Sequence, residues 1–88
     1  MSRASKLAKE AGELAAQIGP MLYGHAEEAQ SAALAELLAM WIAGHFADND
    51  ELTRVWREEL LAQHIEVVRR LVAPCEAQIL DQVRRGAS

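Results

Sequence analysis

The stretch that decides the fold is residues 25–46, HAEEAQSAALAELLAMWIAGHF, which is long, rich in alanine and leucine, and almost free of charge. Only Glu36 is charged between Ala29 and Ala47. At 100° per residue the larger apolar side chains share one broad face, opposite a series of alanines: Leu34, Leu37, Leu38, Trp41 and Ile42. A helix that is apolar on all sides is normally covered on all sides, so we expect neighbouring helices around residues 25–46.

A second helix is predicted before this stretch, over residues 3–18, where apolar residues recur every three or four positions along one stripe. Gly19 and Pro20 end it, because proline disfavours helical geometry in the residue before it and glycine readily adopts a cap conformation. Glu27 and Glu28 then fit the first turn of the apolar helix, where carboxylates face the positive end of the helix dipole.

A third helix is predicted over residues 51–72, with Asp48 and Glu51 resembling a capping box at its start. Its apolar residues cover about half of the circumference. Pro74 lacks a backbone donor, so we expect the helix either to end near Ala73 or to kink there, with a short fourth helix over residues 75–85. The sequence therefore predicts an all-α bundle of three long helices plus a short C-terminal one, with residues 25–46 and 51–72 forming an antiparallel hairpin.

Composition narrows the class of protein. The 88 residues allow one domain, residues 1–88. Acids outnumber bases by 13 to 9, which disfavours general nucleic-acid binding. Cys75 is the only cysteine, so no intrachain disulfide can form, which is typical of a reducing compartment. No leader is expected from the charged first ten residues, and no apolar run reaches the ~20 residues of a membrane span, so we expect a cytoplasmic protein without membrane contact.

No residue pattern favours catalysis or metal binding. His25, His45, His64 and Cys75 have suitable ligand atoms, but the first two lie at opposite ends of one predicted helix and none forms a recognised ligand spacing. The serines stand in no nucleophile motif, and no glycine-rich phosphate loop occurs. We therefore expect no catalytic residue, no cofactor and no metal site, and we predict that the chain is not an enzyme.

The apolar surface is instead typical of an oligomer. Two predicted helices carry more apolar surface than a small monomeric bundle can cover, so we predict a homodimer. Its interface is predicted at seven residues of these helices: Leu38, Trp41, Ile42, Leu61, His64, Ile65 and Val68. His64 lies among apolar neighbours on its helix, and we expect it to be at least partly buried and satisfied by one hydrogen bond.

Two functions of different classes remain open from the sequence. In the first, the homodimer binds another protein as an adaptor, a regulator or an inhibitor. In the second, an apolar pocket at the dimer seam binds a small molecule, with His64 or His45 as its polar group. Neither the identity of a protein partner nor that of a ligand follows from the sequence.

Overall fold

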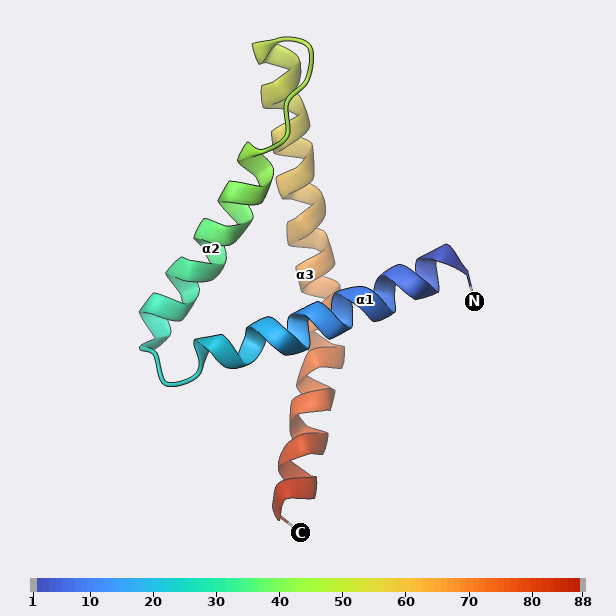
Figure 1. The fold of residues 1–88 in the computed structure, drawn as a ribbon, viewed down its shortest axis with the longest axis vertical. Helices are drawn as coiled ribbons and strands as arrows, with labels where there is room; N and C mark the ends of the chain where they lie inside the picture. The colour runs from blue at the N-terminus through green and yellow to red at the C-terminus, as the bar shows by residue number, and fades with distance from the viewer. Residues whose placement is uncertain (1, 88) are drawn as a thin grey trace. The chain divides into compact units, whose positions relative to one another are not determined.

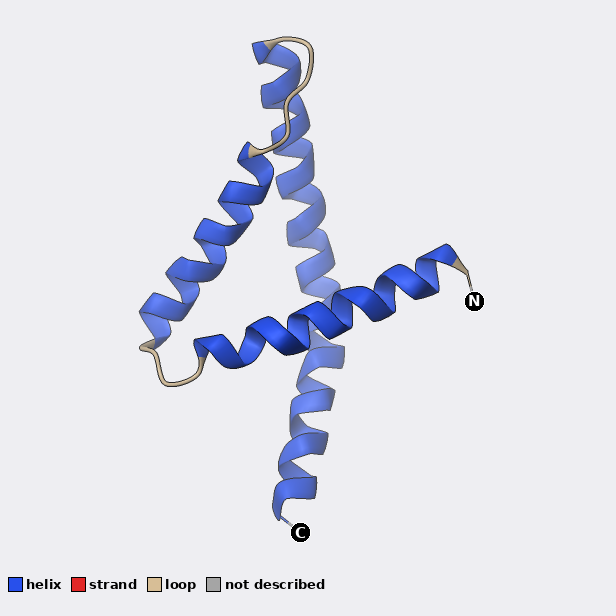
Figure 2. Cartoon of the chain, in the orientation of Figure 1, coloured by secondary structure: helices blue, strands red, loops and turns tan. Residues whose placement is uncertain are grey.

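The structure, a computed structural model, describes residues 2–87, and the side chains of residues 2–86. In this part of the chain the order of elements is α1 (Arg3–Ile18), the 3-10 helix η1 (Gly19–Leu22), α2 (Glu27–Ala43) and α3 (Asp50–Ala87). Figure 1 labels the α-helices, and Figure 2 shows that helices and loops account for all the described residues. The all-α prediction is confirmed. The predicted single domain reaches residues 1 and 88, which lie outside the described residues.

The short fourth helix predicted over residues 75–85 is wrong, because α3 continues through Pro74 to Ala87 (Figure 1). Proline inside a helix removes one backbone hydrogen bond and crowds the preceding turn, at a cost of about 3 kcal/mol. Good helix formers such as Ala73 and Ala77 surround it. The ion pair of Arg70 with Glu66, at 3.3 Å, adds support one turn before the proline. The helical preference of the flanking residues outweighs the local cost.

The described chain divides into two compact units, and the boundary falls within α2, after Leu37. In the first unit, the Ser2 side chain caps α1 by accepting a hydrogen bond from the Ser5 N–H at 3.1 Å. The helix predicted over residues 3–18 spans Arg3–Ile18, and Pro20 lies in the first turn of η1 rather than in an irregular loop. Its fixed φ suits that position, where the missing N–H is not needed.

The connection from η1 to α2 is held by one side chain. Gln30 Nε2 donates hydrogen bonds to the carbonyl oxygens of Leu22, at 2.8 Å, and His25, at 3.0 Å. Gly24 has a φ of 83°, the left-handed region that glycine enters without steric cost. The chain therefore turns at Gly24 and is tied back to the first turns of α2, which begins at Glu27.

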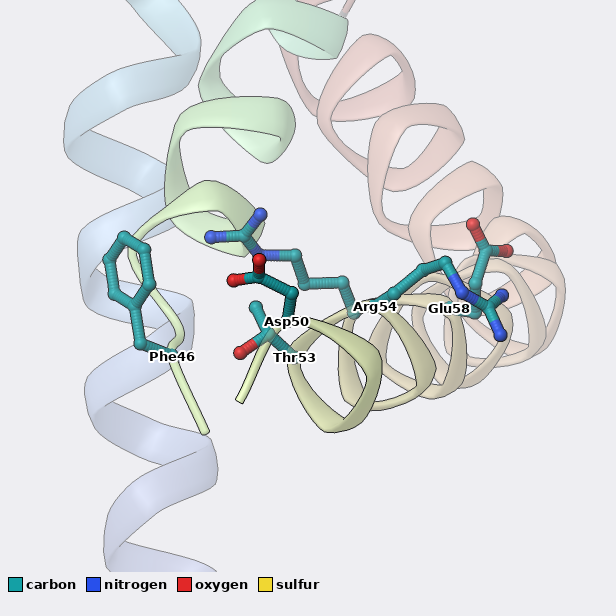
Figure 3. Close-up of a pocket in the computed structure, with 6 residues that line it drawn as sticks. Phe46, Asp50, Thr53, Arg54 and Glu58 are labelled. Carbon is teal, nitrogen blue, oxygen red and sulfur yellow. The ribbon is translucent and has the colours of Figure 1, made fainter. Parts of the chain in front are cut away.

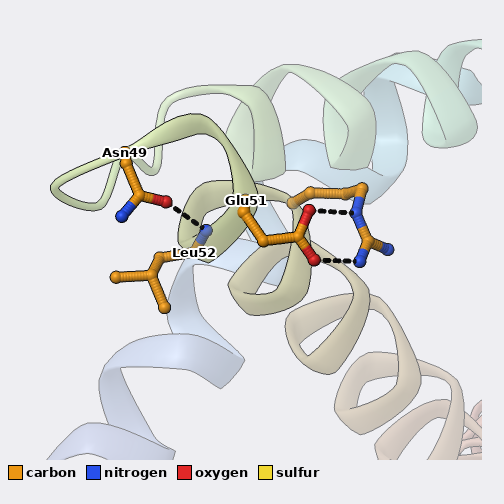
Figure 4. A network of polar contacts seen from close by, with 4 residues as sticks. Asn49, Glu51 and Leu52 are labelled. Carbon is orange, nitrogen blue, oxygen red and sulfur yellow. Dashed lines mark hydrogen bonds and ion pairs between the residues drawn. The ribbon is translucent and has the colours of Figure 1, made fainter.

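The second unit contains the end of α2, the connection of residues 44–49, and α3. Asn49 caps α3, because its Oδ1 accepts a hydrogen bond from the Leu52 N–H at 2.9 Å (Figure 4). The capping role predicted for Asp48 is therefore wrong by one residue. Thr53 is the one buried residue among residues 2–86, and its Oγ1 accepts a hydrogen bond from the Ala47 N–H at 2.9 Å. This bond fixes the connection to the first turns of α3.

Candidate interaction surface

The end of α2 pairs its final carbonyl groups, which a helix end otherwise leaves without partners. The Gly44 N–H donates to the carbonyl oxygens of Met40, at 3.1 Å, and Trp41, at 3.3 Å. The His45 N–H donates to the Ile42 oxygen at 3.0 Å. The helix thus ends at Ala43 with a tight turn, three residues before the end predicted from the sequence.

Arg57, on α3, supplies the remaining donors at this helix end. Its Nη2 donates to the Ala43 oxygen at 2.8 Å, and its Nε donates to the His45 oxygen at 3.1 Å. Its guanidinium also lies over the Phe46 ring, 4.9 Å from the ring centre, at a distance that suits a cation–π interaction. A cation at the negative end of α2 is favourable electrostatically, so Arg57 both caps α2 and joins it to α3.

Beyond this cap, two tryptophans and two histidines form what we call the indole–imidazole cluster: Trp41, His45, Trp56 and His64. The Trp41 ring centre lies 4.4 Å from that of His45 and 4.7 Å from that of His64. His45 also meets Trp56 edge to face, at 5.0 Å. Such tilted and edge-on arrangements are those that aromatic rings prefer. Trp56 and His64 lie on α3, Trp41 lies in the last turn of α2, and His45 follows Gly44. The cluster therefore joins α3 to the end of α2.

Both histidines of the cluster are held by the backbone of the preceding turn. His45 Nδ1 lies 2.7 Å from the Trp41 carbonyl oxygen, and His64 Nδ1 lies 2.8 Å from the Leu60 carbonyl oxygen. A carbonyl oxygen only accepts hydrogen bonds, so each Nδ1 carries the hydrogen and donates it. His64 is half-buried and has one hydrogen bond, as its sequence context predicted.

A second surface runs along α3, beside the side of the helix that carries His64. We call it the α3 stripe and define it by five apolar residues that are all exposed in the single chain: Leu61, 37%; Ile65, 44%; Val68, 56%; Val72, 59%; and Ile79, 58%. Cys75, also exposed, lies between the last two. At 100° per residue, these six residues fall within a sector of about 80° on α3. The stripe is therefore continuous over most of the C-terminal half of α3.

Five of the seven predicted interface residues belong to these two surfaces. Trp41 and His64 are in ring contact within the indole–imidazole cluster. Leu38 and Ile42, on α2, are half-buried. Three others lie in the α3 stripe: Leu61, Ile65 and Val68. The sequence missed Arg57 and Asn49, whose roles depend on partners in the connection, and it missed the continuation of the stripe past Pro74.

The broad apolar sector around α2 has no buried member either. No apolar side chain is buried among residues 2–86. Leu34, Leu37 and Met40 are 52%, 53% and 65% exposed. None of the described helices combines the length and the apolar composition needed to cross a bilayer. Two long helices therefore present apolar side chains that a single chain leaves in contact with water.

A depression open to solvent lies in the second unit, at the start of α3. Its lining residues are Phe46, Asp50, Thr53, Arg54, Arg57 and Glu58, and Figure 3 draws them. Neither His45 nor His64 lines it, so it differs from the pocket that the sequence suggested. Within residues 2–87, no three side chains of His, Cys, Asp or Glu are placed to hold a metal ion.

Next to this depression, Arg54 and Glu51 form a two-point ion pair on the surface of α3 (Figure 4). Arg54 Nη2 donates to one carboxylate oxygen at 2.6 Å, and Nε donates to the other at 3.3 Å. This hydrogen bonding, together with the charge of Glu58, raises the pKa of the Arg54 guanidinium above its ordinary value. Arginine is charged at any physiological pH in either case, so the pair fastens the first turns of α3 rather than providing a proton.

Comparisons with protein-family models, with curated proteins and with solved structures found no match for this chain.

Proposed function

We propose that this chain is a non-enzymatic homodimer that acts by binding another protein, as an adaptor, a regulator or an inhibitor. The α3 stripe is the observation that supports the proposal. Its aliphatic side chains stand in one row and are between 37% and 59% exposed. Contiguous apolar surface of this kind, bordered by charged residues, is typical of protein–protein interfaces.

The proposal includes a helical bundle formed across two chains. Pairing of two stripes would cover the residues that one chain leaves exposed, and burying apolar surface contributes roughly 25 cal/mol per Å². The apolar faces of α2 then remain as surface for the rest of the bundle or for the other protein. A cytoplasmic location also belongs to this proposal, because the one cysteine can form no intrachain disulfide.

Sedimentation equilibrium of the wild-type chain at micromolar concentration tests the dimer. We expect twice the chain mass of 9.7 kDa. A matched pair of variants then tests the surface: Val72→Glu lies in the stripe, and Ala77→Glu lies outside it on the same helix. Each new glutamate has one acid four residues ahead, Glu76 or Asp81, and only the glutamate at position 72 has a cation three residues before it, Arg69.

We expect Val72→Glu to give monomers and Ala77→Glu to remain dimeric, because only the first places a charge in an apolar interface. Circular dichroism serves as the control for helix content. A wild-type monomer, or a dimer indifferent to Val72→Glu, would refute the use of this surface. For the partner, equal capture of one purified candidate by the wild-type chain and by Val72→Glu would place its binding site away from the stripe.

A further inference from the structure

The α3 stripe has the repeat of a coiled coil. From Leu61 to Ile79 its members are separated by alternating steps of four and three residues, so each kind of position recurs after seven residues. In heptad notation, the a positions are Ile65, Val72 and Ile79, and the d positions are Leu61, Val68 and Cys75. Branched residues at a suit packing of one helix against another. The stripe therefore fits a second helix of the same pitch.

One edge of the stripe, at the g positions, already contacts α2 through one residue. His64, at a g position, is in ring contact with Trp41, at 4.7 Å between ring centres. The opposite edge, at the e positions, carries Ala62, Arg69, Glu76 and Val83. Within the described part of the chain, no side chain forms a hydrogen bond, an ion pair or a ring contact with these four residues. The e edge is therefore the one at which an incoming helix would find charged side chains.

Two charges on this edge have opposite signs and lie seven residues apart. Arg69 and Glu76 form no ion pair within residues 2–87, whereas the adjacent Arg70 is paired with Glu66 at 3.3 Å. A pattern of one cation and one anion, a heptad apart on one edge, is complementary to itself when it is turned through a twofold rotation. It selects a second copy of this chain as the occupant of the stripe.

We propose that two copies of α3 pack antiparallel along the stripe, with Arg69 of each facing Glu76 of the partner subunit. This inference rests on the proposed homodimer and adds its orientation and register. In antiparallel coiled coils, e positions face e positions. The twofold axis then passes beside Ala73 and Pro74, which lie outside the a and d positions. Val72 packs against Cys75 of the partner subunit, and Val68 packs against Ile79 of the partner subunit.

The charges of Arg69 and Glu76 exclude both a shifted register and a parallel orientation of the two helices. A shift of one heptad in either direction places Arg69 opposite Arg69 of the partner subunit, or Glu76 opposite Glu76 of the partner subunit, and both juxtapositions repel. A parallel dimer pairs e positions with g positions, which sets Arg69 beside His64 of the partner subunit and Glu76 beside Leu71 of the partner subunit. The proposed register alone pairs opposite charges, and it does so twice.

Disulfide formation between engineered cysteines tests the register. In a Cys75→Ser background, Arg69→Cys and Glu76→Cys are made as separate chains and oxidised alone and as a mixture. We expect a cross-linked dimer from the mixture and little from either chain alone, because a disulfide needs Cα atoms within about 7 Å. Cross-linking of Arg69→Cys alone, or of Glu76→Cys alone, would establish a shifted register. Absence of all cross-links in a sedimenting dimer would refute the antiparallel arrangement.

Charge reversal gives an independent readout. Arg69→Glu and Glu76→Arg should each weaken dimerisation about tenfold, because each replaces two attractive contacts by two repulsive ones at the rim of the interface. The double variant Arg69→Glu with Glu76→Arg should restore wild-type affinity. Failure of the rescue overturns the register while leaving the dimer intact. A monomeric wild-type chain overturns the dimer itself, and the stripe would then belong to α1 or to a different protein.

Discussion

Arg57 Nη2 donates a hydrogen bond to the carbonyl oxygen of Ala43, 14 residues earlier in the chain, at 2.8 Å. The donor lies on α3, and the acceptor is the last residue of α2. Arg57 Nε likewise donates a hydrogen bond from α3 back to the carbonyl oxygen of His45. Further along, Trp41 contacts His64, so pairs of increasing separation are nested around the connection. The chain therefore reverses direction between the end of α2 and the first half of α3.

Replacement of Arg57 by methionine should lower the free energy of unfolding by about 1–2 kcal/mol, because two carbonyl groups lose a charged donor while the aliphatic stem is largely kept. Urea denaturation at fixed protein concentration measures the change. Arg54→Met is the matched control: it breaks an exposed ion pair with Glu51 and should lower the free energy of unfolding less than Arg57→Met does. Equal losses in the two variants would contradict the capping role.

Gly24→Ala should destabilise the first unit by about 1 kcal/mol, because a φ of 83° is strained for a residue with a Cβ atom. No atom lies within 4 Å of the added Cβ, so the cost is conformational rather than steric contact with a neighbour. Gly12→Ala, inside α1, should do the opposite and stabilise by about 0.5–1 kcal/mol. Thermal melts of both variants, followed by circular dichroism, test the difference in sign.

Thr53→Val removes the hydroxyl oxygen that accepts from the Ala47 N–H at 2.9 Å, while it keeps the size and branching of the side chain. Thr53 is 8% exposed, so the Ala47 N–H loses its acceptor beside a buried side chain. We expect the free energy of unfolding to fall by about 1–2 kcal/mol. Thr53→Ser retains the oxygen and should lose less. Hydrogen exchange of the Ala47 amide gives the direct measurement: it should accelerate in the valine variant and stay protected in the serine variant.

Pro74→Ala should stabilise α3, by up to about 3 kcal/mol, because alanine restores a backbone donor and relieves crowding in the preceding turn. The position lies outside the a and d positions of the stripe, so the mass in sedimentation should not change. A higher melting temperature with unchanged assembly is the expected outcome. A lower melting temperature would mean that the proline itself makes a stabilising contact.

Local signals explain which elements the sequence could predict. The regular apolar spacing up to Ile18, followed by Gly19 and Pro20, marks the end of α1 without reference to any other part of the chain. A local signal was misleading at Pro74. Proline by itself disfavours a helix, but whether α3 continues depends on the helix preferences of all the residues around Pro74. At α3, Asp48 and Asn49 are equivalent caps by residue type, and only the hydrogen bond to Leu52 distinguishes them.

The sequence predicts the helices more clearly than it distinguishes the two candidate surfaces from each other. On a helical wheel, the row of Leu60, His64 and Leu71 lies beside the row of Leu61, Ile65 and Val68, and the two merge into one broad apolar sector. The contact of His64 with Trp41 distinguishes them, because it places one member of the first row against the end of α2. Arg57 could not be predicted at all, since its acceptors are backbone oxygens that become neighbours only after the chain reverses.

The lack of any buried apolar side chain among residues 2–86 also has a calorimetric meaning. The heat capacity increase of unfolding comes mainly from apolar surface that becomes hydrated, so an isolated chain of this kind has little of it to release. In an assembled protein, the increase belongs to the association step and is shared between chains. Scanning calorimetry should therefore give a melting temperature that rises with the logarithm of protein concentration, and dilution alone should bring on melting at a temperature where the concentrated sample stays folded.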